Sequence, residues 1–201
     1  MEDYPVVADQ TLSFDDIEAE HGYHNCHFTP ANETIRLMDV TLDHCEFDQT
    51  NFNQGEFVRV TLTHCQLVNT SWLTSRWYDC ELRNLQLSGA DFTGSFWQRT
   101  TIATSKLAYA NFSESQLNGV SLQDCDLLES AFQAVRSKGG VDFAGSRLTG
   151  ASFIETRLKG FDWHAADFEA VSLSADLAKG LTINQFQAAQ LIGLLGIKIS
   201  E

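Results

Sequence analysis

The chain has 201 residues, of which 43% are hydrophobic and 20% charged, so it has enough apolar material for a core and wholesale disorder is excluded. Its 27 acidic and 13 basic residues give a net charge of −14, which argues against direct binding to nucleic-acid phosphates and leaves a merely soluble acidic protein or one with a basic partner. No apolar run is long enough to span a membrane, and the acidic start MEDYPVVADQ lacks the apolar stretch of a secretory signal, so we expect a cytoplasmic protein without membrane contact.

The negative charge is concentrated at the start of the chain. Residues 1–50 hold twelve acidic residues and a single base, Arg36, whereas residues 51–160 are balanced and residues 161–201 are weakly acidic. We expect residues 1–20 to form an N-terminal cap segment. The acidic end is either a solvated surface or a binding surface for a partner, and the charge pattern leaves both interpretations open.

A repeat of five residues dominates the rest of the chain. From Leu37 to Phe132, all twenty positions spaced by five are large and apolar, and the residue two places before each is mostly small. A period of five fits neither an α-helix nor a long strand, so we predict a coil that turns once per pentad and has four sides of five residues each. Positions twenty apart should then stack inside the coil, as in the aromatic ladder of Phe52, Trp72, Phe92, Phe112 and Phe132.

The repeat is interrupted twice. Residues 29–36 are one residue short of two pentads and contain Pro30, and residues 133–140 carry one residue too many before the phase resumes at Phe143. We interpret both breaks, 29–36 and 133–142, as bulged corners or short loops.

Four pentads carry a specific motif of a small residue, Asp or Asn, and then Phe: ADFTG at 90–94, ANFSE at 110–114, VDFAG at 141–145 and ADFEA at 166–170. With these motifs the sequence resembles the pentapeptide-repeat family. The resemblance implies an all-β fold, a right-handed quadrilateral β-helix over residues 21–176 with about seven to eight coils, followed by a short C-terminal helix and strand.

Residues 177–201 depart from the repeat. Thr182 and Gln185 have the spacing of a capping box at the start of a helix, and Ile197 to Ser200 alternate as a short strand. The segment is more apolar than a simple lid over the last coil requires, so we expect it to cap the coil and to form a two-fold homodimer. The expected dimer interface consists of Phe186, Leu191, Ile192, Leu194, Leu195, Ile197 and Ile199.

The chain shows no catalytic or cofactor-binding motif, so we expect no enzyme and no cofactor. Four of the five cysteines fall at the small inward position, as Cys26 does if its pentad is in phase, and we expect buried, reduced thiols. His44 and His64 should stack outside, one coil apart, while the neighbouring Cys45 and Cys65 point inward. We therefore expect no metal site from these pairs.

Outward pentad positions carry carboxylates and a few apolar side chains, and a convex solenoid offers them no pocket. Leu73 and Tyr78 lie in successive pentads and either anchor a partner or cover a corner. The candidate partner surface comprises Asp43, Glu46, Asp48, Leu73, Tyr78, Asp124, Asp126 and Glu129.

Three stretches are similar to corresponding parts of the Qnr and MfpA members of the family: LAYANFSESQLNGVSLQDCDL (107–127), GFDWHAADF (160–168) and NQFQAAQLIGLLGIKIS (184–200). This resemblance implies a homodimer that binds bacterial type II topoisomerases, DNA gyrase or topoisomerase IV, as an acidic mimic of duplex DNA and protects them from quinolones. The alternative is a structural interaction module with a different protein partner, bound through the apolar corner residues.

Overall fold

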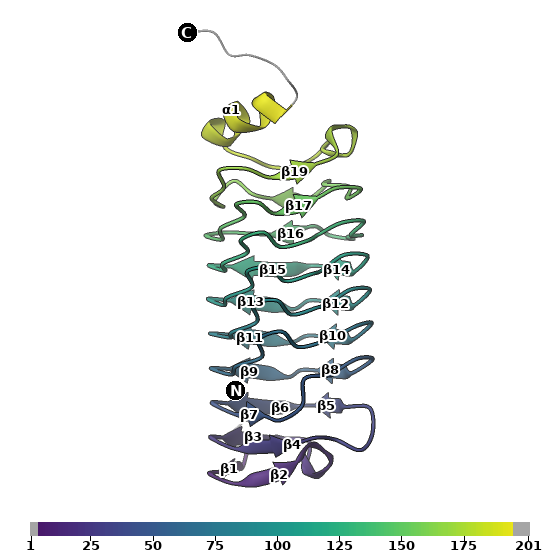
Figure 1. Ribbon diagram of the computed structural model, residues 1–201, viewed down its shortest axis with the longest axis vertical. Coiled ribbons are helices and arrows are strands. Elements are labelled where there is room, and N and C mark those ends of the chain that lie inside the picture. The colour runs from purple at the N-terminus through teal and green to yellow at the C-terminus, as the bar shows by residue number, and fades with distance from the viewer. Residues whose placement is uncertain (1–3, 195–201) are drawn as a thin grey trace.

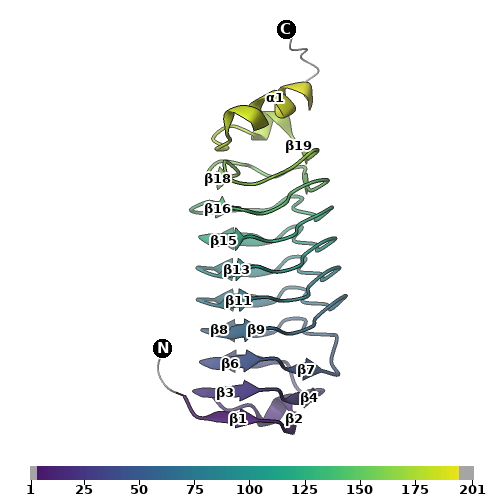
Figure 2. The same cartoon turned by 90° about the vertical axis from the view of Figure 1, so that its left-hand side faces the viewer.

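The computed structural model describes residues 4–194 and is a β-solenoid of about eight turns, built mostly of parallel strands (Figure 1). The expected all-β solenoid with one short C-terminal helix is confirmed. A view turned by 90° shows the coils stacked one above the other along the whole rod, with the helix at the C-terminal end (Figure 2).

Each coil has four faces, which we number in chain order. Face 1 is a five-stranded sheet, and face 2 is a nine-stranded sheet. The strands of face 1 are β5 (Arg36–Met38), β8 (Glu56–Val58), β10 (Arg76–Tyr78), β12 (Phe96–Gln98) and β14 (Gln116–Asn118). The strands of face 2 are β1 (Val6–Ala8), β3 (His21–His24), β6 (Val40–Asp43), β9 (Thr61–Thr63), β11 (Glu81–Arg83), β13 (Thr101–Ala103), β15 (Val120–Gln123), β16 (Val141–Asp142) and β18 (Phe161–Asp162).

Faces 3 and 4 are held largely by single bridges between coils. Face 3 begins with β2 (Thr11–Ser13), β4 (His27–Thr29) and β7 (Glu46–Phe47) and continues as bridges such as Gln66 with Gln86. Face 4 carries bridges such as Asn51 with Ser71 and ends with β17 (Ser152–Phe153) and β19 (Ser172–Leu173). The expected domain boundary at residue 21 stays a prediction. The two strands before this residue, β1 and β2, pair with β3 and β4 after it.

Central pentad residues fill the interior of the coil. Every member of the predicted aromatic ladder is at most 3% exposed. Neighbouring rings stack with centroids 4.0 Å apart for Phe52 and Trp72, 4.9 Å for Phe92 and Phe112, and 5.0 Å for Phe112 and Phe132. The ladder is therefore confirmed, and it extends to Phe153, whose ring lies 4.9 Å from that of Phe132.

The corners use left-handed backbone. From Gln54 to Ala134, the residue two places after each central residue has a positive φ, for example 52° at Arg59 and 55° at Asp79. This conformation turns the chain sharply and is unfavourable for most residues by roughly 1 kcal/mol or more, so the inward packing must outweigh it.

Both interruptions of the repeat are irregular segments without a regular strand. The first is a short loop that runs from β4 on face 3 to β5 on face 1, in the place of face 4, and it buries Ile35. At the second, face 1 loses its strand beyond β14, and Ser137 occupies the place where the pentad count requires a large apolar residue. The surface there is hollowed by about 720 Å³ and lined by cationic side chains that include Arg136, Arg157 and Lys159.

The last coil is covered by a 3₁₀ turn (Ala175–Leu177) and by helix α1 (Gln185–Leu194). The predicted capping box of Thr182 and Gln185 is wrong, because Asn184 caps the helix instead. The side-chain oxygen Oδ1 of Asn184 accepts a hydrogen bond from the backbone N–H of Gln187 at 3.0 Å. In return, Oε1 of Gln187 accepts one from the backbone N–H of Asn184 at 2.9 Å. Gln187 also donates to the carbonyl oxygens of Trp163 and Ala166, which fixes the helix on the coil below. Within the described residues, no helix is long and apolar enough to cross a membrane.

All five cysteines are free and buried, as predicted. Burial raises the pKa of Cys45, Cys80 and Cys125 to about 11 and that of Cys65 to about 12, because the thiolate would lose its hydration.

We predict that the native thiols react far more slowly with a disulfide reagent at pH 8 than those of the urea-unfolded chain, because all five are buried in the folded state. The thiols of the unfolded chain ionise first as the pH rises, so the stability contributed by the four thiols with a raised pKa is full below about pH 9 and falls above it. Time courses of thiol release with and without urea test this, and fast reaction of the folded chain would contradict the burial.

Candidate functional site

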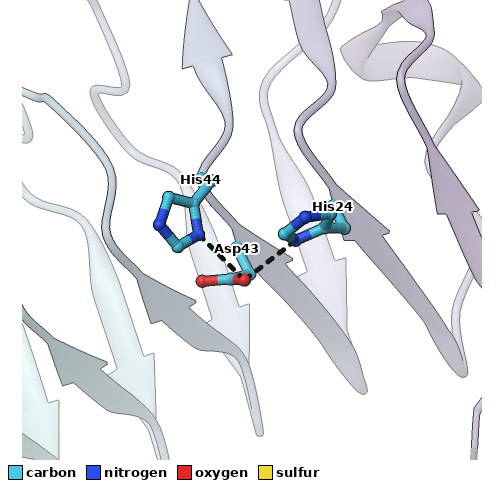
Figure 3. A group of neighbouring side chains, drawn as sticks. All are labelled: His24, Asp43 and His44. Carbon is cyan, nitrogen blue, oxygen red and sulfur yellow. Dashed lines mark hydrogen bonds and ion pairs between the residues drawn. The ribbon is translucent and has the colours of Figure 1, made fainter.

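Three histidines surround the carboxylate of Asp43 on the outside of face 2. Asp43 ends β6 and lies beside His24, which ends β3, because the two strands pair with Tyr23 opposite Leu42. The Asp43 Oδ2 atom is 2.9 Å from Nδ1 of His24 and 3.0 Å from Nδ1 of His44 (Figure 3). The side chains of His24, Asp43 and His44 are accessible from solvent, so they form a surface cluster of the N-terminal coils.

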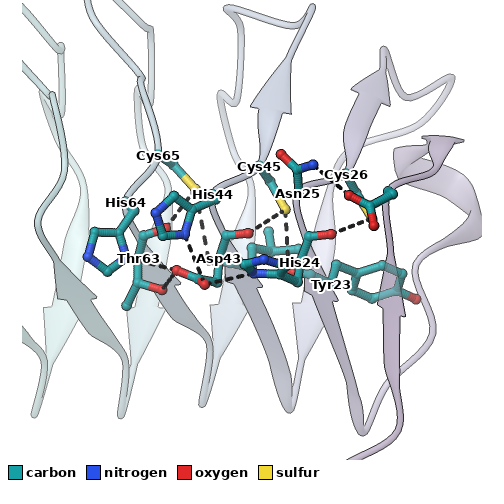
Figure 4. Close-up of polar contacts among 12 residues, drawn as sticks. Tyr23, His24, Asn25, Cys26, Asp43, His44, Cys45, Thr63, His64 and Cys65 are labelled. Carbon is teal, nitrogen blue, oxygen red and sulfur yellow. Dashed lines mark hydrogen bonds and ion pairs between the residues drawn. The ribbon is translucent and has the colours of Figure 1, made fainter.

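The other carboxylate oxygen of Asp43 has its own donors. Thr63 Oγ1 donates to Oδ1 at 2.6 Å, and His64 Nδ1 lies 2.8 Å from the same oxygen (Figure 4). Partial burial would raise the pKa of Asp43, but hydrogen bonds from Thr63 and the three histidines outweigh it and hold that pKa well below its usual range. The carboxylate therefore stays charged at any physiological pH.

The rings of His44 and His64 stack with centroids 4.3 Å apart, which confirms the expected stacking one coil apart. The neighbouring thiols point inward, and Cys45 Sγ lies 3.4 Å from the carbonyl oxygen of Tyr23. The histidines and cysteines therefore do not converge. The contact between His24 and Asp43 was not predicted. An unbroken repeat of twenty residues would place His24 beside His44. The shortened segment 29–36 reduces this spacing to nineteen, so His24 lies beside Asp43.

The remaining carboxylates of the candidate surface form two groups on face 3 and at its two corners. Glu46 and Asp48 flank His27, whose Nε2 lies 3.0 Å from Asp48, and the hydrogen bond to Asp48 raises the pKa of His27. The second group, Asp124, Asp126 and Glu129, lies four coils further along the rod. Asp124 and Glu129 are exposed at corners.

Leu73 and Tyr78 do not lie together with these carboxylates. Leu73 lies on face 4 and Tyr78 on face 1, and both are half-buried. Tyr78 packs against Phe96, with ring centroids 5.4 Å apart, and pairs in register with Val58, which in turn pairs with Met38. The apolar surface is therefore a stripe of Met38, Val58, Tyr78 and Phe96 along face 1, of which Leu73 is not a member.

At the corner after face 1, opposite charges alternate from coil to coil. Arg59 contacts Asp39 at 2.5 Å, and Arg99 contacts Asp79 at 2.6 Å, both through two nitrogens. Asp126 has an arginine partner as well, Arg147 at 2.8 Å. These exposed ion pairs are worth little stability, but they cancel charge locally, so the uncompensated negative charge lies elsewhere.

A four-sided solenoid with its large side chains packed inward is an interaction scaffold, a type of fold that is not typically catalytic. Two family models match the chain: "Pentapeptide repeat region" over residues 35–112 and "Pentapeptide repeats (8 copies)" over residues 98–132. The chain belongs to the pentapeptide-repeat family. No curated protein matches it in sequence.

Several solved structures are similar to this chain. A trypsin-treated form of QnrB1, described as a plasmid-mediated fluoroquinolone resistance protein, is 20% identical over 98% of each chain, with a TM-score of 0.49. Full-length QnrB1 is 14% identical over 96% of this chain and all of its own, with a TM-score of 0.34. HetL from Nostoc sp. strain PCC 7120, a protein involved in heterocyst differentiation regulation, is 16% identical over 89% of this chain and 83% of its own, with a TM-score of 0.37.

Proposed function

We propose that this chain is a Qnr/MfpA-like protein that binds a bacterial type II topoisomerase, DNA gyrase or topoisomerase IV, as a mimic of duplex DNA, and modulates the enzyme or protects it from quinolones. The observation that supports the proposal is the set of carboxylates on face 3 and at its two corners. Glu46 and Asp48 lie on face 3 near one end of the rod. Asp124 and Glu129 lie at the corners before and after face 3, about 19 Å further along at the strand spacing of one coil.

The charge distribution supports face 3 and its two corners as the binding side. The corner after face 1 carries alternating arginine and aspartate, and the hollow at the second break is lined by Arg136, Arg157 and Lys159. The cationic hollow would repel a basic DNA-binding surface, and the charge-balanced corner would not attract one. Face 3 with its two corners is thus the side on which fixed carboxylates could replace DNA phosphates without any reading of bases.

The C-terminal helix is the proposed dimer contact. Phe186 on α1 is 85% exposed, whereas Leu191 packs against the core of the last coil and Ile192 is half-buried. A two-fold pairing of copies would cover Phe186 and double the rod. Of the other proposed interface residues, Leu194 ends α1, and Leu195, Ile197 and Ile199 lie outside the described residues.

We expect the purified chain to bind gyrase or topoisomerase IV in a salt-sensitive manner and to be displaced by duplex DNA, measured by biolayer interferometry. Asp124→Asn combined with Glu129→Gln should weaken binding by about tenfold, because the exposed carboxylates at the two corners of face 3 are lost.

The matched control is Glu114→Gln combined with Glu155→Gln, which removes the same charge from exposed corners after face 4. Its binding should stay close to that of the original chain. If neither enzyme binds, or if both double variants weaken binding equally, the proposed mimicry at face 3 is wrong.

The alternative, an interaction module with another partner, is favoured by the apolar stripe of Met38, Val58, Tyr78 and Phe96 on face 1. Met38 is 50% exposed, and Tyr78 and Phe96 contact one another at the surface. Binding through this stripe would resist salt and fail with Tyr78→Ser, so the same measurement distinguishes the two functions.

A further inference from the structure

We infer that His24, Asp43 and His44 form a binding site for one divalent transition-metal ion of the Zn²⁺ type. The two histidine nitrogens and the Asp43 carboxylate oxygen all lie within 4.8 Å of one another, and Figure 3 shows both rings directed at the carboxylate. Bonds of about 2.1 Å to a tetrahedral ion place its ligand atoms roughly 3.4 Å apart. Small side-chain rotations from the observed contacts of 2.9 and 3.0 Å are therefore sufficient.

The two oxygens of Asp43 have separate partners, and this division identifies the ligand atom. Oδ1 receives hydrogen bonds from Thr63 and His64, whereas Oδ2 faces Nδ1 of both His24 and His44. Oδ2 would bind the ion together with the two nitrogens. A protein carboxylate fixed through its second oxygen is the usual support for a metal ligand.

His64 has the role of a positioning residue. Asn84 Nδ2 lies 3.1 Å from Nε2 of His64, and an amide donor there leaves the proton of the ring on Nδ1. His64 Nδ1 then donates to Asp43 Oδ1 at 2.8 Å. Its ring also stacks on that of His44, so His64 orients one ligand through a hydrogen bond and another through packing.

A metal ion bound at Nδ1 requires each ring to carry its proton on Nε2. In the metal-free cluster, Nδ1 of His24 and Nδ1 of His44 face Asp43 Oδ2. A metal at Nδ1 replaces these contacts, and each ring keeps one proton on Nε2. The side chains of His24 and His44 are 51% and 53% exposed, so water can accept a hydrogen bond from each Nε2.

The ligand set determines the class of ion. Two imidazole nitrogens with one carboxylate oxygen suit Zn²⁺, Ni²⁺, Co²⁺ or Cu²⁺, whereas Mg²⁺ prefers oxygen ligands alone. Three protein ligands leave a position for water. A bound ion would join β3 to β6 and add positive charge to the end of the chain that holds twelve acidic residues and one base. It would stabilise the folded state because the cluster exists only there.

The inference is tested by titrating the metal-free full-length chain with Zn²⁺ in a calorimeter. We expect one ion per chain, loss of saturable binding with either His24→Ala or His44→Ala, and affinity about tenfold lower with His64→Ala. The matched control is His164→Ala, which removes a histidine paired with Asp162 at 2.7 Å on the same face and should leave the affinity unchanged.

Thermal unfolding in EDTA checks that the variants fold. We expect them to fold, because the substituted histidines are exposed. Zn²⁺ should raise the melting temperature of the original chain and of His164→Ala but not that of His44→Ala, and Mg²⁺ should raise neither. The inference is wrong if Zn²⁺ does not bind, if His44→Ala binds it equally well, or if Mg²⁺ acts in the same way. The measurement uses the chain alone, so its outcome is independent of topoisomerase binding.

Discussion

Replacing Phe92 with alanine is expected to lower the free energy of unfolding by about 3–5 kcal/mol. Phe92 is fully buried, and its ring stacks on that of Phe112 with centroids 4.9 Å apart and meets the edge of Trp97 at 5.2 Å. The coils above and below are fixed by backbone hydrogen bonds such as Phe92 N to Asn111 O at 2.7 Å, so they cannot close the cavity. Urea unfolding followed by tryptophan fluorescence measures the loss.

The control for this prediction is Tyr109→Ala, which removes an aromatic side chain of similar size that is 58% exposed. Its unfolding free energy should change by less than about 1 kcal/mol. Equal stability of Phe92→Ala and the original chain would show that the aromatic ladder does not support the fold.

Replacing Phe186 with aspartate is expected to convert a dimer of about 45 kDa into a monomer of 22.4 kDa in sedimentation at micromolar concentration. A phenylalanine that is 85% exposed on a described helix gains about 1.5–3 kcal/mol per chain when a second copy covers it. A carboxylate at the same place would be buried without a partner in a dimer and fully hydrated in a monomer.

Leu194→Asp, at the end of the same helix, should have the same effect, whereas Gln185→Asp introduces the same charge about 100° around the helix and should leave the dimer intact. Thermal unfolding of the variants shows whether the solenoid itself is preserved. If the original chain sediments as a monomer, the proposed dimer is wrong, and the rod presented to a topoisomerase is half as long.

The interior could be predicted from the sequence, whereas contacts between coils on the surface could be predicted only where the repeat is unbroken. A large apolar residue every five positions leaves one solution for packing, so Phe52, Trp72 and the buried thiols were placed correctly. His44 and His64 are twenty residues apart with no break between them, and their stacking followed. His24 is separated from Asp43 and His44 by the shortened segment 29–36. Its neighbour on the next coil therefore depends on the length of that segment.

The helix cap shows a second limit of sequence reasoning. The sequence offers two pairs in which a glutamine follows a polar residue by three places: Thr182 with Gln185, and Asn184 with Gln187. The choice depends on where the last coil ends, because Gln187 must also reach the carbonyl oxygens of Trp163 and Ala166. Tertiary contacts, rather than the local motif, set the start of the helix.

The two irregular segments have a consequence for how such a chain can change over time. One segment is a residue short and the other a residue long, yet face 2 keeps its register across both, with Tyr23 opposite Leu42 and Val120 opposite Val141. Small insertions and deletions can therefore accumulate on one face without shifting the register of another. Duplication of a twenty-residue unit would lengthen the rod by one strand spacing, about 4.8 Å, and add one position to each ladder. Length and surface chemistry can thus evolve separately, while the buried scaffold is inherited almost unchanged.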